Sequence, residues 1–232
     1  MFHHSPFDVW SRLLLLATCY LSLGIRPWPS LSALTFRALS PALCFVAKTK
    51  SLGSGEIHAA LDRLAAAISA RHASTEKLLL LGIANGGIEL ARRLAARLAP
   101  RASRPLCGVL DISFHRDDIS RNPIPKEFAP THIPVDVNGA TVILVDDVLF
   151  SGRTAKAALD ELFDHGRPAK VELAVLADRG GRRLPVAADY TGLTLPALDG
   201  ERVVVHLDPA DPGRDAIRVE AAAPRPESKI KK

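Results

Sequence analysis

Residues 142–154 read Val142-Ile143-Leu144-Val145-Asp146-Asp147-Val148-Leu149-Phe150-Ser151-Gly152-Arg153-Thr154. The first four residues form a continuous apolar run, which is typical of a strand with helices on both faces. Two carboxylates follow, at the edge where open α/β sheets bind their ligands. A short loop with one glycine then leads into a helix, whose N-terminal N–H groups attract anions. This order predicts a sugar-phosphate site, in which the carboxylates accept hydrogen bonds from ribose hydroxyls and the loop holds the phosphate.

The rest of the chain alternates strand and helix patterns. An apolar run of strand length occurs at residues 78–83, further strands are expected at 106–114, 171–177 and 203–207, and helical patterns occur at 55–71, 88–98 and 154–165. Such alternation predicts an α/β fold with a mainly parallel sheet and right-handed crossovers. Residues 115–138 are polar, contain four prolines and show no periodicity. A long irregular stretch of this kind is either disordered or a functional lid.

The thirteen quoted residues resemble the phosphoribosyl-pyrophosphate (PRPP) signature of type I phosphoribosyltransferases. Their sequence is similar to that of the PyrR group, whose members are pyrimidine operon attenuators and also uracil phosphoribosyltransferases. Other segments also resemble this family, namely 112–118, 166–168, 176–180 with 184–185, and 188–192, and the resemblance extends over residues 55–219. It implies a central, mainly parallel sheet flanked by helices, with a small hood and a flexible lid loop.

The resemblance also implies an activity, the conversion of uracil and PRPP into UMP and pyrophosphate. The catalytic residues would be Asp146, Asp147 and Arg116. Residues 142–154 would bind PRPP, with both aspartates on the ribose hydroxyls, and Arg116 would neutralise the departing pyrophosphate. We find no dedicated all-protein metal cage in the sequence, so Mg²⁺ is expected to arrive with PRPP.

Two further groups of residues are candidates for the same site. Asn85, Gly86 and Gly87 follow a strand and would form the pyrophosphate loop, although a plain turn remains an alternative. Asp178, Arg179 and Tyr190 would contact the base, and an Asp–Arg surface pair is the alternative for the first two. Phe150 stands where purine-salvage relatives carry an acid that suits a purine nitrogen, so its presence favours a pyrimidine.

Two other functions remain open. The first is an RNA-binding attenuation regulator that senses UMP or PRPP without significant catalysis. The net charge of +5 suits an mRNA leader, but only 5% of the residues are aromatic. Asp62 and Ala66 also replace the Thr and His expected in RNA-binding relatives, which disfavours this role. The second alternative is a purine phosphoribosyltransferase. In each case the resemblance implies a homo-oligomer.

Composition bounds the organisation of the chain. Its 232 residues, 47% of them apolar, allow one sizeable domain with appendages. We predict a poorly ordered extension at residues 1–52, the phosphoribosyltransferase domain at 53–220 and a disordered tail at 221–232. Three sparse cysteines without metal-ligand spacing indicate a reducing, cytoplasmic location.

The N-terminal segment has three open interpretations. Its apolar run at residues 13–25 is shorter than the roughly 20 residues of a membrane span, so no membrane partner is expected. The segment is a mis-assigned start, with initiation near Val46 or Leu52, or an extension without function, or a targeting sequence.

Overall fold

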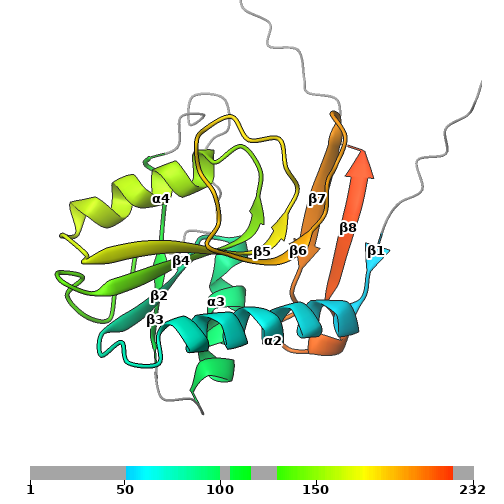
Figure 1. Ribbon diagram of the computed structural model, residues 1–232. Coiled ribbons are helices and arrows are strands. Elements are labelled where there is room, and N and C mark those ends of the chain that lie inside the picture. Colours follow the sequence, from blue (N-terminus) through cyan, green and yellow to red (C-terminus); the bar gives the residue numbers. More distant parts are fainter. Residues whose placement is uncertain (1–50, 100–104, 116–129, 222–232) are drawn as a thin grey trace, which may run out of the picture. The chain divides into compact units, whose positions relative to one another are not determined.

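A five-stranded sheet forms the centre of the fold, as the computed structural model shows for residues 51–99, 105–115 and 130–221 (Figure 1). Its strands are β2 (Leu78–Ile83), β3 (Leu106–Leu110), β4 (Thr141–Leu149), β5 (Lys170–Asp178) and β6 (Tyr190–Thr194). They lie in the order β3-β2-β4-β5-β6, and every pairing in this sheet is parallel. The predicted parallel α/β fold is therefore confirmed.

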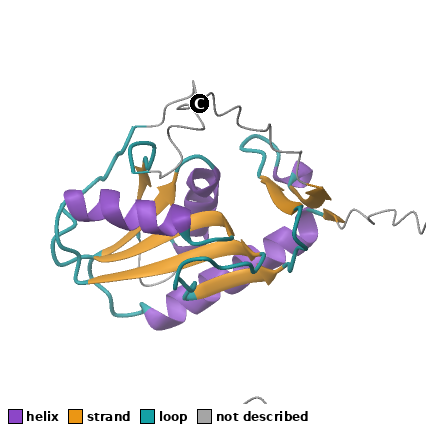
Figure 2. Cartoon of the chain, turned by 90° about the horizontal axis from the view of Figure 1, so that it is seen from above, coloured by secondary structure: helices purple, strands orange, loops and turns teal. Residues whose placement is uncertain are grey.

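Helices cover both faces of this sheet, which explains the continuous apolar runs. Helices α2 (Ser54–Arg71) and α3 (Gly86–Leu98) lie on one face, and α4 (Arg153–Asp164) lies on the other (Figures 1 and 2). Every residue of β2 is buried. Leu78 and Leu80 pack in the core under α2 and α3, whereas Leu79 and Leu81 pack in the core under α4. A strand that contributes to two cores needs apolar side chains on both faces.

A second, three-stranded antiparallel sheet stands beside the first, and we call it the hood. It consists of β1 (Ser51–Leu52), β7 (Glu201–His206) and β8 (Ala216–Ala221), in the order β1-β8-β7. A 3₁₀ turn, η2 (Pro212–Arg214), lies between β7 and β8. The hood implied by the resemblance is thus present, and all described elements lie within residues Val46–Lys232.

Three strands, β1, β6 and β8, were not expected from the sequence, and the strand expected at 203–207 is β7. β6 and β8 carry exposed residues within short segments, so their apolar pattern is weak and pairing with a neighbouring strand defines them. β1 lies inside the segment assigned to the N-terminal extension, because two residues that pair only with β8 leave no pattern in the sequence. Residues 1–50 and 222–232 lie outside the described part.

None of the described helices combines the length and the apolar character needed to cross a lipid bilayer.

Candidate active site

A pocket of about 360 Å³ opens at the carboxyl ends of the central strands, where open α/β sheets bind ligands. Its walls come from the turn after β2, the segment after β3, the end of β4 and the start of α4. The lining residues are Ala84, Asn85, Gly86, Ile112, Asp146, Asp147, Val148, Ser151, Arg153 and Thr154. The structure thus brings the two aspartates, the predicted phosphate loop and the predicted pyrophosphate loop together in one pocket.

Asp146 and Asp147 form the acidic wall of this pocket. The Oδ1 atom of Asp146 accepts a hydrogen bond from the backbone N–H of Asp147 at 3.0 Å, and Asp147 Oδ1 accepts one from Val148 N–H at 2.7 Å. Burial raises the pKa of Asp146 well above its usual range, and the adjacent charge of Asp147 raises it further. Burial raises the pKa of Asp147 as well. Ionised, this pair favours a ligand that brings hydroxyl donors or positive charge.

The phosphate loop lies between β4 and α4. Gly152 adopts a φ of 89°, which strains any residue with a Cβ, and its carbonyl accepts the N–H of Lys156 at 3.0 Å. The carbonyl of Ser151 accepts the N–H groups of Arg183 and Leu184, each at 3.0 Å. The loop is therefore fixed from both sides, with the first turn of α4 at the pocket wall, where its N–H groups favour an anion.

The predicted pyrophosphate loop divides into two parts. Asn85 and Gly86 line the pocket, and the peptide bond between Ala84 and Asn85 is cis. A Cβ on Gly86 would overlap the carboxylate of Asp147. Gly87 does not line the pocket, because it packs against β4, and a Cβ there would overlap the carbonyl oxygen of Val145. Gly86 thus leaves room for the acid, and Gly87 lets α3 approach the sheet.

Some residues of the quoted stretch do not reach the ligand space. The first four residues of the stretch, 142–145, are buried in the two cores, where they hold β4 in place behind the pocket. Leu149 is also buried, whereas Phe150 is partly exposed and has the guanidinium carbon of Arg179 at 3.8 Å from its ring centroid. Within the quoted stretch, the residues that line the pocket are Asp146, Asp147, Val148, Ser151, Arg153 and Thr154.

The expected base-binding residues lie in two different places. Asp178 and Arg179 end β5 beside the phosphate loop, although they do not line the 360 Å³ pocket. Arg179 donates from Nη1 to the carbonyl of Glu201 in the hood at 2.8 Å. The structure corrects the expected position of Tyr190, because this residue begins β6, and its buried hydroxyl donates to Glu172 at 2.7 Å. Arg116 lies outside the described residues, and its role stays a prediction.

Arg182 was not identified from the sequence, although it connects two walls of the site. Its guanidinium donates to the carbonyls of Leu149 at 3.2 Å and Phe150 at 2.7 Å, and to the carboxylate of Asp178 at 2.5 Å. It therefore joins the end of β5 to the start of the phosphate loop. Arg182 lies between residues 176–180 and 184–185, which resemble the family, and no pattern in the sequence marks it.

Comparisons with known proteins agree with this geometry. The chain matches the family model of the phosphoribosyl transferase domain over residues 53–210. It is 45% identical over 175 residues to the bifunctional protein PyrR of Leifsonia xyli subsp. xyli, a match that covers 73% of this chain and 94% of the relative. It is 47% identical over 173 residues to the bifunctional protein PyrR of Streptomyces coelicolor, with 74% and 89% covered.

The solved structures show the same fold. The hypoxanthine phosphoribosyltransferase of Trypanosoma cruzi matches with a TM-score of 0.54 and 19% identity, over 73% of this chain and 94% of that chain. At this identity the likeness concerns the fold alone.

Proposed function

Because this chain belongs to the phosphoribosyltransferase family and, within it, to the PyrR proteins, we propose that it makes UMP and pyrophosphate from uracil and PRPP. One observation carries the proposal: two adjacent carboxylates, buried Asp146 and half-buried Asp147, share a pocket with a glycine-containing phosphate loop. Ribose hydroxyls are donors and the phosphate is an anion, so the two halves of the pocket suit the two halves of an activated sugar phosphate.

Each wall of the pocket has a role in this reaction. Asp146 and Asp147 hold the ribose hydroxyls, and residues 151–154 bind the 5-phosphate. Asn85 and Gly86 approach the pyrophosphate, and Arg116 neutralises it as it departs. Catalysis then consists mainly of positioning and of stabilising the charge that develops between ribose and pyrophosphate.

Mg²⁺ enters this site as part of the substrate. The buried carboxylates, whose pKa values are raised, fit a partner that carries positive charge, and oxygen ligands suit this cation. Mg²⁺ bound to PRPP supplies charge neutralisation on pyrophosphate oxygens, and the chain supplies acceptors and backbone donors around it.

Position 150 supports a pyrimidine as the base. Phe150 lies against the guanidinium of Arg179, so this position offers no carboxylate to a purine nitrogen. The purine phosphoribosyltransferase remains the competing enzyme.

A panel of bases tests the proposal. The full chain would be assayed with PRPP and Mg²⁺ against uracil, hypoxanthine, guanine and adenine, with pyrophosphate release as the readout. We expect turnover with uracil and little with the purines, and the Asp147→Asn variant is the matched control for activity of this site. Faster turnover of hypoxanthine or guanine than of uracil would replace this proposal with the purine enzyme.

Regulation of pyrimidine genes through an mRNA leader is the second candidate, favoured by the word bifunctional in the names of the relatives. One surface feature argues against it. Asp62, with 68% of its side chain exposed, presents an acid on α2 and accepts a hydrogen bond from Arg97 at 2.8 Å. Filter binding to the leader of its own pyrimidine operon, with and without UMP, tests the candidate. Salt-sensitive nanomolar binding would establish this second role.

A further inference from the structure

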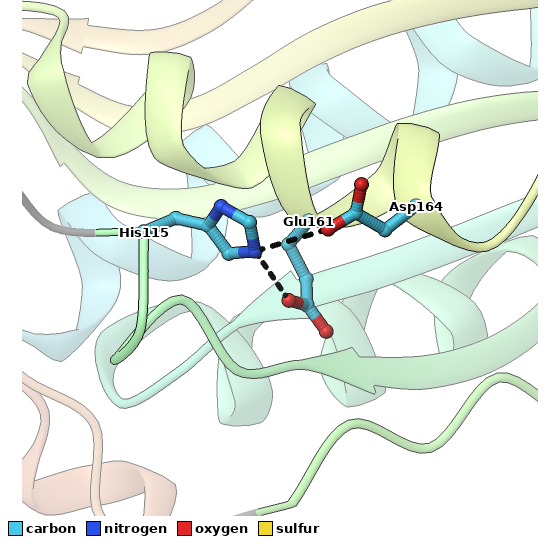
Figure 3. A group of neighbouring side chains, drawn as sticks. All are labelled: His115, Glu161 and Asp164. Carbon is cyan, nitrogen blue, oxygen red and sulfur yellow. Dashed lines mark ion pairs between the residues drawn. The ribbon is translucent and has the colours of Figure 1, made fainter.

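A cluster of possible metal ligands lies on the outer side of α4. His115 Nε2 is 3.0 Å from Glu161 Oε2 and 3.4 Å from Asp164 Oδ2 (Figure 3). One ligand atom from each of the three residues lies within 4.8 Å of the other two. No sequence pattern marks this cluster, because His115 follows β3 and is far along the chain from the two acids.

Neighbouring residues orient Glu161 and hold the backbone of His115. Glu161 and Asp164 are three positions apart on α4, so both project from one face of the helix. The second oxygen of Glu161, Oε1, accepts a hydrogen bond from Thr131 Oγ1 at 2.8 Å and lies 3.1 Å from His165 Nε2. The backbone N–H of His115 donates to the carbonyl of Ile112 at 3.0 Å. Glu161 therefore keeps Oε2 directed at His115, in the way that outer partners orient metal-binding carboxylates.

The spacing and charge of the cluster suit a small divalent ion. Zn²⁺ binds nitrogen and oxygen ligands at about 2.0–2.1 Å in a tetrahedron, so two of its ligand atoms stand about 3.3 Å apart. The separations of 3.0 and 3.4 Å bracket that value. Two carboxylates with one neutral imidazole carry two negative charges, which a divalent ion neutralises. Imidazole selects the Zn²⁺ class over Mg²⁺ and Ca²⁺, which prefer oxygen.

We propose that His115, Glu161 and Asp164 bind one divalent first-row transition-metal ion of the Zn²⁺ class, with the remaining position open to water. None of the three residues lines the pocket of Asp146 and Asp147, so this site is separate from the Mg²⁺ that PRPP brings. The ion joins the segment after β3 to α4, and through Thr131 and Glu161 it also supports the segment that precedes β4.

Equilibrium dialysis of the full chain against Zn²⁺ tests this site without reference to catalysis. We expect one tightly bound equivalent in the natural protein and weak binding of Mg²⁺. His115→Ala and Glu161→Gln each remove a direct ligand and should weaken the Zn²⁺ affinity by at least about 100-fold, since the loss of an outer-shell partner already costs about 10- to 100-fold. Lower pH should weaken binding too, because the imidazole must be neutral to bind a metal.

Two further variants make the result decisive. His206→Ala changes an exposed histidine on β7 and is the matched control, which should keep the tight equivalent. Asp164→Asn changes a side chain that is 70% exposed, so it tests the site without disturbing the core. Thermal unfolding with a chelator present shows whether each variant folds. The proposal is overturned if the natural protein binds no tight equivalent, or if the site variants retain it.

Discussion

At the scale of single residues, Asp146 and Asp147 are two carboxylates in surroundings that disfavour their charged form. Their burial raises the pKa of each carboxyl, so the ionised pair is less stable in the folded chain than in water. A ligand with hydroxyl donors and a cation removes this penalty when it binds. The same groups that weaken the empty fold are thus the groups that hold the proposed substrate.

Asp146→Asn and Asp147→Asn should therefore each lower the activity and raise the stability of the fold. Each variant keeps an amide oxygen for the backbone N–H that its carboxylate accepts, but loses a charge-assisted contact of about 1.5–3 kcal/mol. The loss of a contact of this energy from the transition state should lower kcat/KM for PRPP roughly 10- to 100-fold. An acid whose pKa is raised by folding costs stability once it ionises, so each variant should unfold at a higher temperature near neutral pH, a gain that fades as the pH falls toward the unfolded pKa.

Steady-state kinetics and thermal unfolding of the ligand-free protein measure both effects. Near-normal kinetics in both variants would contradict the assignment of the two acids.

Gly86→Ala should damage the site by a steric route. Its Cβ would overlap the carboxylate of Asp147, so the acid has to move or the loop has to shift. We expect a loss of PRPP use, measured as kcat/KM. Gly55→Ala is the matched control, since a Cβ there meets nothing within 4 Å on α2. The control should keep activity and gain up to about 1 kcal/mol of helix stability. Equal activity of the two variants would argue against a close fit between Gly86 and Asp147.

The structure brings some of the expected site residues together in one pocket and places others outside it. Asp146, Asp147 and the loop to Thr154 were predictable because strand, acids, glycine and helix stand in one continuous segment. Tyr190 was misplaced because the start of β6 is set by pairing with β5, which is distant in the sequence. Arg182 was missed because it acts on backbone carbonyls, whose positions no residue pattern reveals.

At the scale of elements, the same distinction separates the central sheet from the hood. β2 and β4 were predictable, since strands buried on both faces read as continuous apolar runs. The hood joins β1 from one end of the domain to β7 and β8 from the other. The strands of the hood are partly exposed, so their apolar patterns are weak. β1 is far from β8 in the sequence, and no local pattern marks a pairing over that distance.

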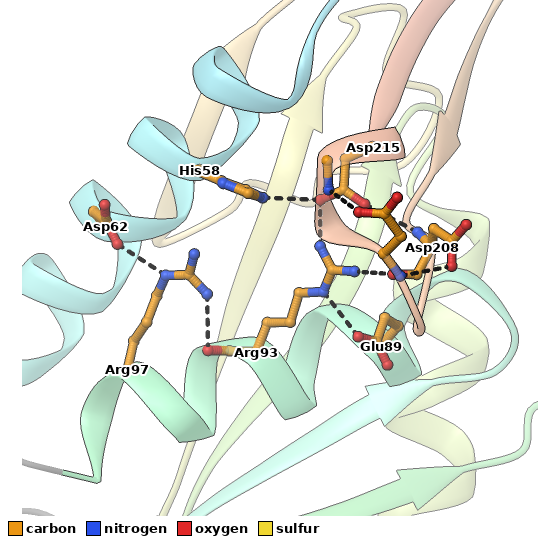
Figure 4. A network of polar contacts seen from close by, with 9 residues as sticks. His58, Asp62, Glu89, Arg93, Arg97, Asp208 and Asp215 are labelled. Carbon is orange, nitrogen blue, oxygen red and sulfur yellow. Dashed lines mark hydrogen bonds and ion pairs between the residues drawn. The ribbon is translucent and has the colours of Figure 1, made fainter.

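The attachment of the hood depends on a buried ion-pair network between α2, α3 and the turn before β8 (Figure 4). The carboxylate of Asp215 is fully buried and contacts Arg93 Nη1, His58 Nε2 at 3.1 Å and the backbone N–H of Asp208 at 2.9 Å. Arg93 also donates to the carbonyl of Asp208 at 2.5 Å and to Glu89 at 2.8 Å. The network therefore connects α3, which begins at the pocket, to the hood.

Asp215→Asn should destabilise the fold by about 3 kcal/mol, because breaking a buried ion pair leaves Arg93 only partly compensated. The matched control is Asp62→Asn, which removes an exposed partner of Arg97 from the same pair of helices. An exposed pair contributes at most about 1 kcal/mol, so the control should change little. Urea unfolding of the two variants measures the difference. Similar losses in both would show that the buried network contributes no more than a surface pair.

At the scale of the whole molecule, the central sheet carries acidic side chains in two environments that shift the pKa in opposite directions. At its carboxyl edge, burial raises the pKa of Asp146 and Asp147. Earlier along the strands, Glu172 pairs in register with Ile143 and is buried, yet its carboxylate is fully compensated. It lies 2.6 Å from Lys170 Nζ and accepts hydrogen bonds from the Tyr190 hydroxyl at 2.7 Å and from Arg71 at 3.1 Å, with His72 Nε2 at 2.7 Å. Burial therefore disfavours the charged form of the two aspartates at the pocket, whereas the surrounding donors favour the charged form of Glu172.

The pH dependence of unfolding should follow from Glu172. Burial alone would raise its pKa, but the hydrogen bonds from Lys170, Tyr190, His72 and Arg71 outweigh burial and lower the pKa from 4.5 to about 2. An acid whose pKa is depressed by folding adds stability that is complete above the unfolded pKa and is lost as the pH falls from about 4.5 to about 2. The contribution is at most about 3 kcal/mol.

Glu172→Gln tests this linkage against Glu76→Gln, which changes an exposed glutamate. Urea unfolding near pH 7 should show Glu172→Gln to be less stable than the natural protein, with the two converging as the pH approaches about 2. Glu76→Gln should follow the natural protein throughout. Because Glu172 lies outside the pocket, PRPP turnover by folded Glu172→Gln should stay unchanged, which separates a stability effect from a catalytic one. Parallel stability curves for Glu172→Gln and the natural protein would contradict the linkage, because a constant difference means that the carboxylate binds its proton equally in both states.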